Sequence, residues 1–387
     1  MSVSSLTDTR WRSNFRRRLR AWYKRQARDL PWRRSREPYQ VWISEIMLQQ
    51  TQVSTVRPYF QRFIRSFPNI ASLAAADEQD VLRHWEGLGY YRRARQLHRA
   101  AQQVVAEFGG QLPREPDRLR TLPGIGPYTA GAILSIAFDA REPILEANTT
   151  RLLARLLAYR GDVGSAAGQR TLWALAAALL PRKDVGRFNQ ALMELGSLVC
   201  KPRAPACNAC PVRTWCGSAA HGLQDQIPKA ARKTAYEEIR EAAVIIRRRG
   251  RVLLRRCGPD ERWSGLWDFP RVPLSAGDPA ALAGELTRKV HRLTGVIAAE
   301  HRHLKTIKHG VTRFRITLEC FEAAYVENAA SQPHISPQKW LWPKQLPSYP
   351  LNSTGRKLAG LVAGHPPPAG QAARGQRTNP RRRAYAP

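Results

Sequence analysis

Apolar residues in the first two thirds of the chain recur with the period of an α-helix. Between about residues 10 and 225 they stand three or four positions apart in segment after segment, with breaks at Gly109–Gly110, Pro123–Gly124 and Pro181. This spacing puts the apolar side chains of each segment on one helix face. The clearest segments are 81–85, 92–108, 130–138, 151–159 and 172–180. The pattern predicts a mostly α N-terminal domain whose first helix begins near Trp11.

In the last third of the chain the pattern becomes short and alternating. Apolar runs at 242–246 and 251–254 flank Gly250 as in a β-hairpin, and residues 314–321 alternate polar and apolar side chains like a half-buried strand. A helical period over 282–293 lies between them. Strands and a helix in this order predict an α+β fold.

These patterns divide the chain into four segments. We expect a helical domain over 1–225, a linker over 226–238, an α+β domain over 239–362 and a disordered basic tail over 363–387. The tail consists mainly of Pro, Gly, Ala and Arg and contains no acid, a composition that cannot bury enough apolar surface to fold.

The charge of the chain changes the expected function more than its hydropathy does. Lys and Arg number 63 against 30 Asp and Glu, a formal net charge of +33. Such an excess favours a polyanionic partner, because Lys and Arg gain affinity by releasing the counterions condensed on phosphates. A merely soluble basic surface is the alternative. No apolar run approaches the ~20 residues that a membrane span requires.

A loop of four cysteines follows the helices, in the pattern Cys200-x6-Cys207-x2-Cys210-x5-Cys216. Thiolates are the soft ligands of iron–sulfur clusters and of zinc. Structural zinc commonly uses two separate C-x2-C pairs, whereas here one pair is flanked by single cysteines. The spacing therefore favours a [4Fe–4S] cluster. A zinc site is one alternative, and four cysteines that pack in the core without binding a metal are the other.

The segment 122–130, which reads LPGIGPYTA, predicts a helix-hairpin-helix. Gly124 and Gly126 would allow the backbone to approach a phosphate closely, and the N–H groups of the following helix would point at it. Next to the basic composition, the expected anion is the phosphate backbone of a nucleic acid.

Two acids stand in apolar stretches. Glu45 lies within 41–48 and Glu146 follows Ile144 and Leu145. Burial there would raise the pKa of each carboxyl and suit it to proton transfer. Glycosidic cleavage uses two carboxyl groups, one to protonate the leaving group and one to stabilise the sugar cation. Helix capping or ion pairing is the alternative.

Together these features resemble the helix-hairpin-helix DNA glycosylase superfamily and, within it, the MutY-type adenine DNA glycosylases. The resemblance covers roughly residues 15 to 350, and its most specific segments are 30–33, 44–53, 87–91, the hairpin and the cysteine loop. It implies base-excision repair in which adenine opposite 8-oxoguanine or guanine is flipped out and hydrolysed from its sugar. It also implies that Glu45 protonates adenine, chiefly at N7, and that a [4Fe–4S] cluster is the cofactor.

The resemblance also implies roles for other positions. Tyr128 and Asn148 match residues that position the acid pair and the sugar. The pocket for the extruded adenine would be lined by Trp32, Arg33, Leu48, Val53 and Gln190. The residues matched to the duplex are Gln49, Gln50, Thr51 and Tyr90, with Gly124 and Gly126 of the hairpin.

Glu146 and Tyr128 are the two positions that bear on the alternatives to an active adenine glycosylase. The family normally carries Asp where this chain has Glu146, and Ala147 follows in place of Gly. A protein that binds the lesion without cleaving is therefore one alternative. Endonuclease III resembles this chain in fold and cluster but needs a Lys at the position of Tyr128 to form a Schiff base. Tyr128 therefore favours a monofunctional glycosylase that leaves an abasic site.

The C-terminal third resembles the Nudix-like domain of the same family, most clearly at 265–270. The acids that would bind Mg²⁺ in a pyrophosphatase of this fold are missing from 288–295, so hydrolysis there is not expected. The family role is recognition of 8-oxoguanine, for which Thr312 is the candidate. We expect a monomer that acts on duplex DNA with A:8-oxoguanine or A:G mispairs, away from membranes, in the cytoplasm and at the nucleoid of a bacterial-type cell.

Overall fold

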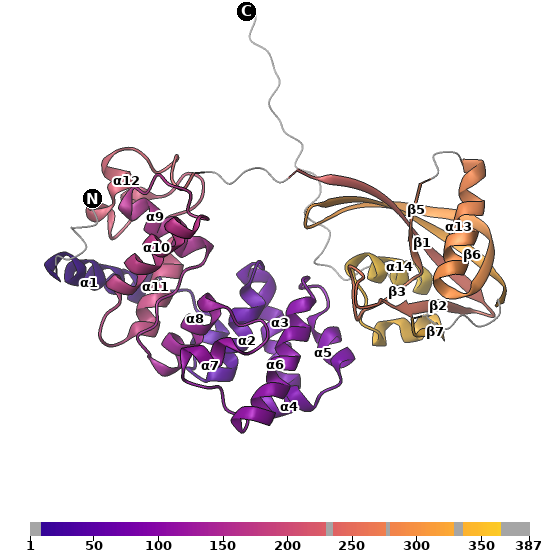
Figure 1. Cartoon of the computed structure of the whole chain (residues 1–387), viewed down its shortest axis with the longest axis horizontal. Coiled ribbons are helices and arrows are strands. Elements are labelled where there is room, and N and C mark those ends of the chain that lie inside the picture. Colours follow the sequence, from indigo (N-terminus) through magenta and orange to yellow (C-terminus); the bar gives the residue numbers. More distant parts are fainter. Residues whose placement is uncertain (1–8, 230–234, 276–278, 329–335, 365–387) are drawn as a thin grey trace, which may run out of the picture. The chain divides into compact units, whose positions relative to one another are not determined.

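The computed structural model describes residues 9–229, 235–275, 279–328 and 336–364. The chain divides into two compact units, Met1–Lys233 and Thr234–Pro387 (Figure 1). From residue 365 onwards, the predicted disordered tail lies outside the described residues. No helix in the described ranges is both apolar enough and long enough to span a bilayer.

The first unit is helical, as its hydrophobic period predicted. Its α-helices are α1 (Thr9–Gln26), α2 (Pro38–Leu48), α3 (Val53–Ser66), α4 (Ile70–Ala75), α5 (Glu78–Trp85), α6 (Arg92–Phe108), α7 (Pro116–Arg120), α8 (Pro127–Phe138), α9 (Ala147–Leu157), α10 (Ala166–Leu179), α11 (Val185–Leu198) and α12 (Gly217–Ala220). Short 3₁₀ helices cover Pro31–Arg33, Cys207–Ala209 and Arg213–Trp215. The breaks predicted at Gly109 and Pro181 follow the ends of α6 and α10.

One core joins the first helix to the last part of this unit. Phe15 and Leu19 of α1 are fully buried in a cluster with Phe188 of α11. The Phe15 ring lies 6.4 Å from that of Phe188 and 6.3 Å from that of Trp215, both in edge-on contact. Because Trp215 precedes Cys216, the same core holds the cysteine loop against α1 and α11.

The second unit is an α+β domain, also as predicted. Its strands are β1 (Glu237–Arg248), β2 (Arg251–Arg256), β3 (Trp267–Asp268), β4 (Arg271–Pro273), β5 (Val296–Val311), β6 (Phe314–Asn328) and β7 (Gln338–Leu341). Its helices are α13 (Pro279–Thr294), the 3₁₀ helix Pro343–Ser348 and α14 (Ser353–Ala363). The strand order is β3-β2-β1-β6-β5, with β4 paired to β1 and β7 to β2.

The middle of strand β1, residues 242–246, is apolar on both faces because a helix covers each face (Figure 1). Ala243 and Ile245 pack in the cluster that contains α14, whereas Val244 and Ile246 pack in the cluster that contains α13. This two-sided burial explains the unbroken apolar run in the sequence. Strand β1 begins at Glu237, within the segment predicted as linker, because its first residues pair in parallel with β6.

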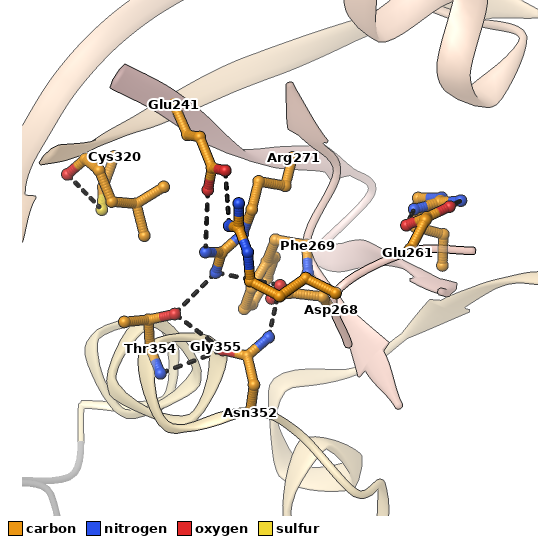
Figure 2. A network of polar contacts seen from close by, with 12 residues as sticks. Glu241, Glu261, Asp268, Phe269, Arg271, Cys320, Asn352, Thr354 and Gly355 are labelled. Atoms are coloured by element: carbon orange, nitrogen blue, oxygen red, sulfur yellow. Dashed lines mark hydrogen bonds and ion pairs between the residues drawn. The ribbon is translucent and has the colours of Figure 1, made fainter. Parts of the chain in front are cut away.

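A buried polar network fastens α14 to the sheet. Asp268, at the end of β3, accepts a 2.6 Å hydrogen bond from Asn352, the N-cap of α14 (Figure 2). Arg271 lies 3.0 Å from Asp268 and donates to the hydroxyl of Thr354 at 2.7 Å. A Cβ atom on Gly355 would lie 2.6 Å from Asp268 Oδ1, so only glycine allows this close approach.

Candidate active site

A cavity of about 840 Å³ in the N-terminal unit brings together the two acids singled out in the sequence. Its walls come from the segment 28–33, from α2 and the start of α3, and from α8, α9 and α11. The predicted site residues that line it are Trp32, Arg33, Glu45, Leu48, Thr51, Val53, Tyr128, Glu146, Asn148 and Gln190. The predicted adenine pocket and the predicted acid pair are therefore parts of one cavity.

Glu45 lies on the buried helix α2 and is only 5% exposed. The hydroxyl of Tyr128 donates a 2.6 Å hydrogen bond to its Oε2. Burial raises the pKa of Glu45 to about 7, against the lowering effects of this hydrogen bond and of the Arg33 charge, and the charge of Glu146 adds to the rise. Burial also raises the pKa of Tyr128, so the phenol stays protonated and donates. Glu45 is thus an acid that can hold a proton near neutral pH.

Glu146 is the N-cap of α9. Its carboxylate accepts hydrogen bonds from the backbone N–H groups of Asn148 at 2.7 Å and Thr149 at 2.9 Å, and its own N–H donates to the Thr149 hydroxyl in a capping box. Burial raises the pKa of Glu146, opposed by these bonds and by the charge of Arg151. The Glu146 side chain is therefore fixed at the N-terminus of α9.

Asn148 is held between Glu146 and Arg151. Its Nδ2 donates to Glu146 at 3.2 Å, and its Oδ1 accepts from Arg151 at 2.9 Å. Arg151 also donates to the carbonyl oxygens of Gly196 and Cys200, both at 2.7 Å. A Cβ on Gly196 would lie 2.8 Å from Asn148, so glycine is needed for α9 and α11 to pack this closely. Arg151 thereby links the cavity to the first cysteine of the loop.

Sequence reasoning missed the buried Glu194, which also lines the cavity. Its carboxylate accepts 2.8 Å hydrogen bonds from Arg28 and Arg33. Burial alone would raise its pKa, but the two arginines lower it to about 2. The sequence signal that identified Glu45 was also available for Glu194, because it is an acid among apolar neighbours such as Leu192 and Leu195. Other cavity residues that were not predicted are Arg28, Asp29, Leu30, Gln52, Ser54, Arg57, Met193 and Ser197.

The residues matched to the duplex lie outside the cavity lining, apart from Thr51. Gln49 donates to the Thr129 hydroxyl at 3.2 Å, and the side chains of Gln50 and Tyr90 point to solvent. The predicted hairpin is present between α7 and α8, where Gly126 is the N-cap of α8. Gly124 has a φ of 82° and would crowd Gln96 with a Cβ at 3.1 Å, so the turn requires glycine.

The four cysteines of the loop line a second, small cavity with apolar walls from α9 and from Val199 and Val212. Arg155 donates to Cys200 Sγ at 3.3 Å and to the carbonyl of Lys201 at 2.7 Å. Among the described residues, no three His, Cys, Asp or Glu side chains are grouped tightly enough to hold one metal ion. Four thiols around one common space are a donor set that suits an iron–sulfur cluster, in which each thiolate binds a different iron.

Thr312 lies in the other unit, in the two-residue turn between β5 and β6. It is exposed, and its φ of 51° is rare for a β-branched residue. Its hydroxyl donates to the carbonyl of Val311 at 2.7 Å. The turn thus presents the Thr312 side chain at the surface of the C-terminal unit.

Family comparisons agree with this architecture. Residues 43–177 match the HhH-GPD superfamily of base excision DNA repair proteins, and residues 241–360 match the NUDIX domain. The structure of a thermostable thymine-DNA glycosylase superposes with a TM-score of 0.51 and 27% identity, covering 55% of this chain and 98% of that chain. The fold and the site together define a DNA N-glycosylase of base excision repair that carries a NUDIX domain.

Two relatives narrow the class. The human adenine DNA glycosylase is 32% identical over 410 residues, which cover 91% of this chain and 74% of the human protein. The adenine DNA glycosylase of Mycolicibacterium smegmatis is 43% identical over 195 residues, 50% of this chain and 66% of that protein. The chain belongs to the adenine DNA glycosylase family.

Proposed function

We propose that this enzyme removes adenine from duplex DNA where adenine is mispaired with 8-oxoguanine or guanine, and that it leaves an abasic site. The observation that carries the proposal is the pair of carboxyl groups in one cavity, the buried Glu45 and the half-buried Glu146, whose pKa values are both raised. The name shared by the relatives, adenine DNA glycosylase, supports adenine as the base. The target nucleotide must leave the stack to reach these groups.

The reaction breaks the bond between C1′ of the sugar and N9 of adenine. Glu45 gives its proton to adenine, chiefly at N7, so that the electron pair of the broken bond leaves with a neutral base. The carboxylate of Glu146, oriented together with Asn148, stabilises the oxocarbenium-like sugar. Water then adds to C1′, and its proton returns to Glu45.

We further propose that the enzyme does not cut the strand itself. Strand cleavage by a related glycosylase requires an amine that forms a Schiff base with the sugar. The position facing Glu45 holds the phenol of Tyr128, which cannot form that imine. Borohydride should therefore trap no covalent complex during adenine release. A trapped complex would favour the endonuclease III-like alternative.

The test of the substrate measures free adenine from duplexes that place adenine opposite 8-oxoguanine, guanine, thymine or cytosine. We expect release opposite the first two and little opposite the others. Equal release from all four duplexes would contradict the mispair specificity. Tight binding to the 8-oxoguanine duplex with no release would favour the non-cleaving alternative.

For the C-terminal unit we propose recognition of 8-oxoguanine without hydrolysis. Helix α13 carries Arg288 and Lys289 where a hydrolase would carry acids, and Glu285 is ion-paired to Lys289 at 2.6 Å. Thr312 is the proposed partner of the lesion edge. Thr312→Ala should reduce the preference for 8-oxoguanine over guanine. An unchanged preference would remove Thr312 from this role.

We also propose that Cys200, Cys207, Cys210 and Cys216 hold a [4Fe–4S] cluster. The bound cluster would act as a cross-link that fixes the loop, because all four ligand positions are cysteines and none is open to substrate. Iron analysis and a visible absorbance shoulder test this proposal. Zinc in place of iron would contradict it, and Cys210→Ser should lose the absorbance.

The proposed partner is duplex DNA and the proposed state is a monomer, because one unit supplies every residue that lines the cavity. DNA affinity should fall steeply with salt, since phosphate contacts release counterions. A flat plot of log affinity against log salt would contradict a phosphate-dominated interface. Light scattering of the free protein tests the monomer.

A further inference from the structure

Two exposed side chains of the N-terminal unit stand on an unusual backbone. Gln50, in the loop after α2, has a φ of 56°, and Tyr90, in the loop before α6, has a φ of 50°. Bulky residues rarely adopt left-handed φ, and the surrounding structure has to hold them there. Gln50 is exposed, and Tyr90 is 50% exposed. Both belong to the residues matched to the duplex.

The side chain of Arg93, on α6, reaches the loop that carries Gln50. Arg93 is 8% exposed. Its Nη1 donates to the carbonyl of Ile46 at 2.8 Å, in the last turn of α2, and to the carbonyl of Gln49. Its Nη2 donates to the Thr51 hydroxyl at 3.1 Å. Because the last carbonyls of a helix lack partners within it, Arg93 caps α2 and fixes the residues on both sides of Gln50.

The same guanidinium holds the loop that carries Tyr90. Nη2 of Arg93 donates to the carbonyl of Gly89 at 3.2 Å, and the backbone N–H of Arg93 donates to the carbonyl of Tyr90 at 2.8 Å. The guanidinium carbon lies 5.5 Å from the centroid of the Tyr90 ring and 5.4 Å from that of Trp85. The Arg93 side chain thus contacts both loops that contain a residue with left-handed φ.

The charge of Arg93 suits this position. Across the described residues its partners are carbonyls, one hydroxyl and two aromatic rings, with no carboxylate among them. Burial lowers its pKa to about 10, so the guanidinium stays charged at neutral pH. The negative end of the α2 dipole and the ring faces stabilise the charge. A Lys ammonium presents its donors from a single atom and cannot span both loops.

We propose that Arg93 is a positioning residue. It holds Gln50 and Tyr90 in the conformation that fills the space left in the duplex when the target nucleotide is extruded. The inference rests on the proposed function and adds a coupling between the two loops. Arg93 does not line the catalytic cavity, so it acts through these loops and not on the acid pair. Its loss should slow base extrusion and leave the chemistry of Glu45 unchanged.

The experiment compares full-length Arg93→Lys with the wild type under single-turnover conditions. We expect adenine release to slow by roughly tenfold or more, because small displacements of positioned groups carry large rate effects. The pH midpoint of the rate should not move. Fluorescence of a 2-aminopurine placed beside the target adenine should brighten less on binding, since that base unstacks when its neighbour is extruded.

Arg16→Lys is the matched control. Arg16 also caps a helix, since it donates to the carbonyls of Ala178, Leu179 and Leu180 at the end of α10, and it does not line the catalytic cavity. Its replacement should lower the melting temperature by about as much as Arg93→Lys does, without slowing extrusion. Equal slowing in both variants would mean that Arg93 has only a structural role.

A double-mutant cycle tests the coupling. In a Tyr90→Ala background, Arg93→Lys should slow adenine release much less than it does in the wild type, because the side chain that Arg93 positions is absent. Fully additive effects would overturn the proposal. If Arg93→Lys does not fold, Thr51→Val replaces it, with a smaller slowing expected and an unchanged rate contradicting the proposal. If the wild type releases no adenine, the proposed function fails, while the 2-aminopurine signal still tests Arg93.

Discussion

The hydroxyl of Tyr128 donates a 2.6 Å hydrogen bond to Oε2 of Glu45. Tyr128 is the second residue of α8, directly after the glycine turn of the hairpin, and Glu45 lies inside the buried helix α2. The turn expected to meet a phosphate therefore also fixes the group that faces the acid. The hairpin thus positions the phenol that hydrogen-bonds to Glu45.

The rate of adenine release should fall as the pH rises through about 7. Glu45 must carry a proton to give to the base, and burial raises its pKa to about 7. Single-turnover rates measured between pH 5 and 9 check this prediction. A rate that increases steadily with pH would show that Glu45 acts in its ionised form.

The same pKa shift predicts that Glu45 destabilises the fold at alkaline pH. A carboxyl whose pKa is raised from 4.5 to about 7 binds its proton more tightly in the folded state, so stability is retained below pH 4.5 and lost as the pH rises through 7. Glu45→Gln should therefore raise the free energy of unfolding at pH 8, by up to about 3 kcal/mol. At pH 4 the substitution should change the free energy of unfolding little. Urea unfolding at the two pH values measures the difference.

Tyr128→Phe should move the alkaline limb of the pH–rate profile to higher pH. The hydrogen bond from Tyr128 lowers the pKa of Glu45, so removing the hydroxyl lets burial raise it further. The profile of Tyr128→Phe against that of the wild type tests the direction. A shift to lower pH would show that the phenol does not stabilise the carboxylate.

Glu146→Asp should keep release within about tenfold of the wild type, whereas Glu146→Gln should lose about a hundredfold or more. Asp is a strong N-cap and keeps the charge, while Gln lacks the charge that stabilises the sugar cation. The melting temperatures of both variants separate capping from catalysis. Wild-type rates in Glu146→Gln would contradict the assigned role.

Glu194→Gln should destabilise the protein by about 3–5 kcal/mol, since it leaves Arg28 and Arg33 without their buried carboxylate. The pKa of Glu194 is lowered to about 2, so its contribution is complete above pH 4.5 and disappears as the pH falls through 2. The wild type should lose stability over this window. Glu194→Gln should lose much less, as measured by chemical unfolding at pH 5 and pH 3.

The sequence could predict the features that depend on local pattern. Helical periodicity located the helices, and the hairpin followed from Gly124 and Gly126. Acids in apolar stretches identified Glu45 and Glu146, because burial is what shifts their pKa values. The close spacing of four cysteines likewise predicted a shared site, and all four line one cavity.

Features that depend on distant contacts could not be predicted. The apolar neighbours of Glu194 could have marked it as a buried acid, but no local pattern marks its ion-pair partners Arg28 and Arg33, more than 160 positions away. Arg92 is exposed and the adjacent Arg93 is buried. This difference arises only from the packing of α2 against α6.

The most direct test of the central claim is single-turnover cleavage of a duplex with one adenine opposite 8-oxoguanine. The wild type and Glu45→Gln are assayed with and without alkali after the reaction. We predict strand breaks that require alkali in the wild type and are absent in Glu45→Gln. Breaks without alkali, or wild-type release by Glu45→Gln, would contradict a monofunctional glycosylase whose acid is Glu45.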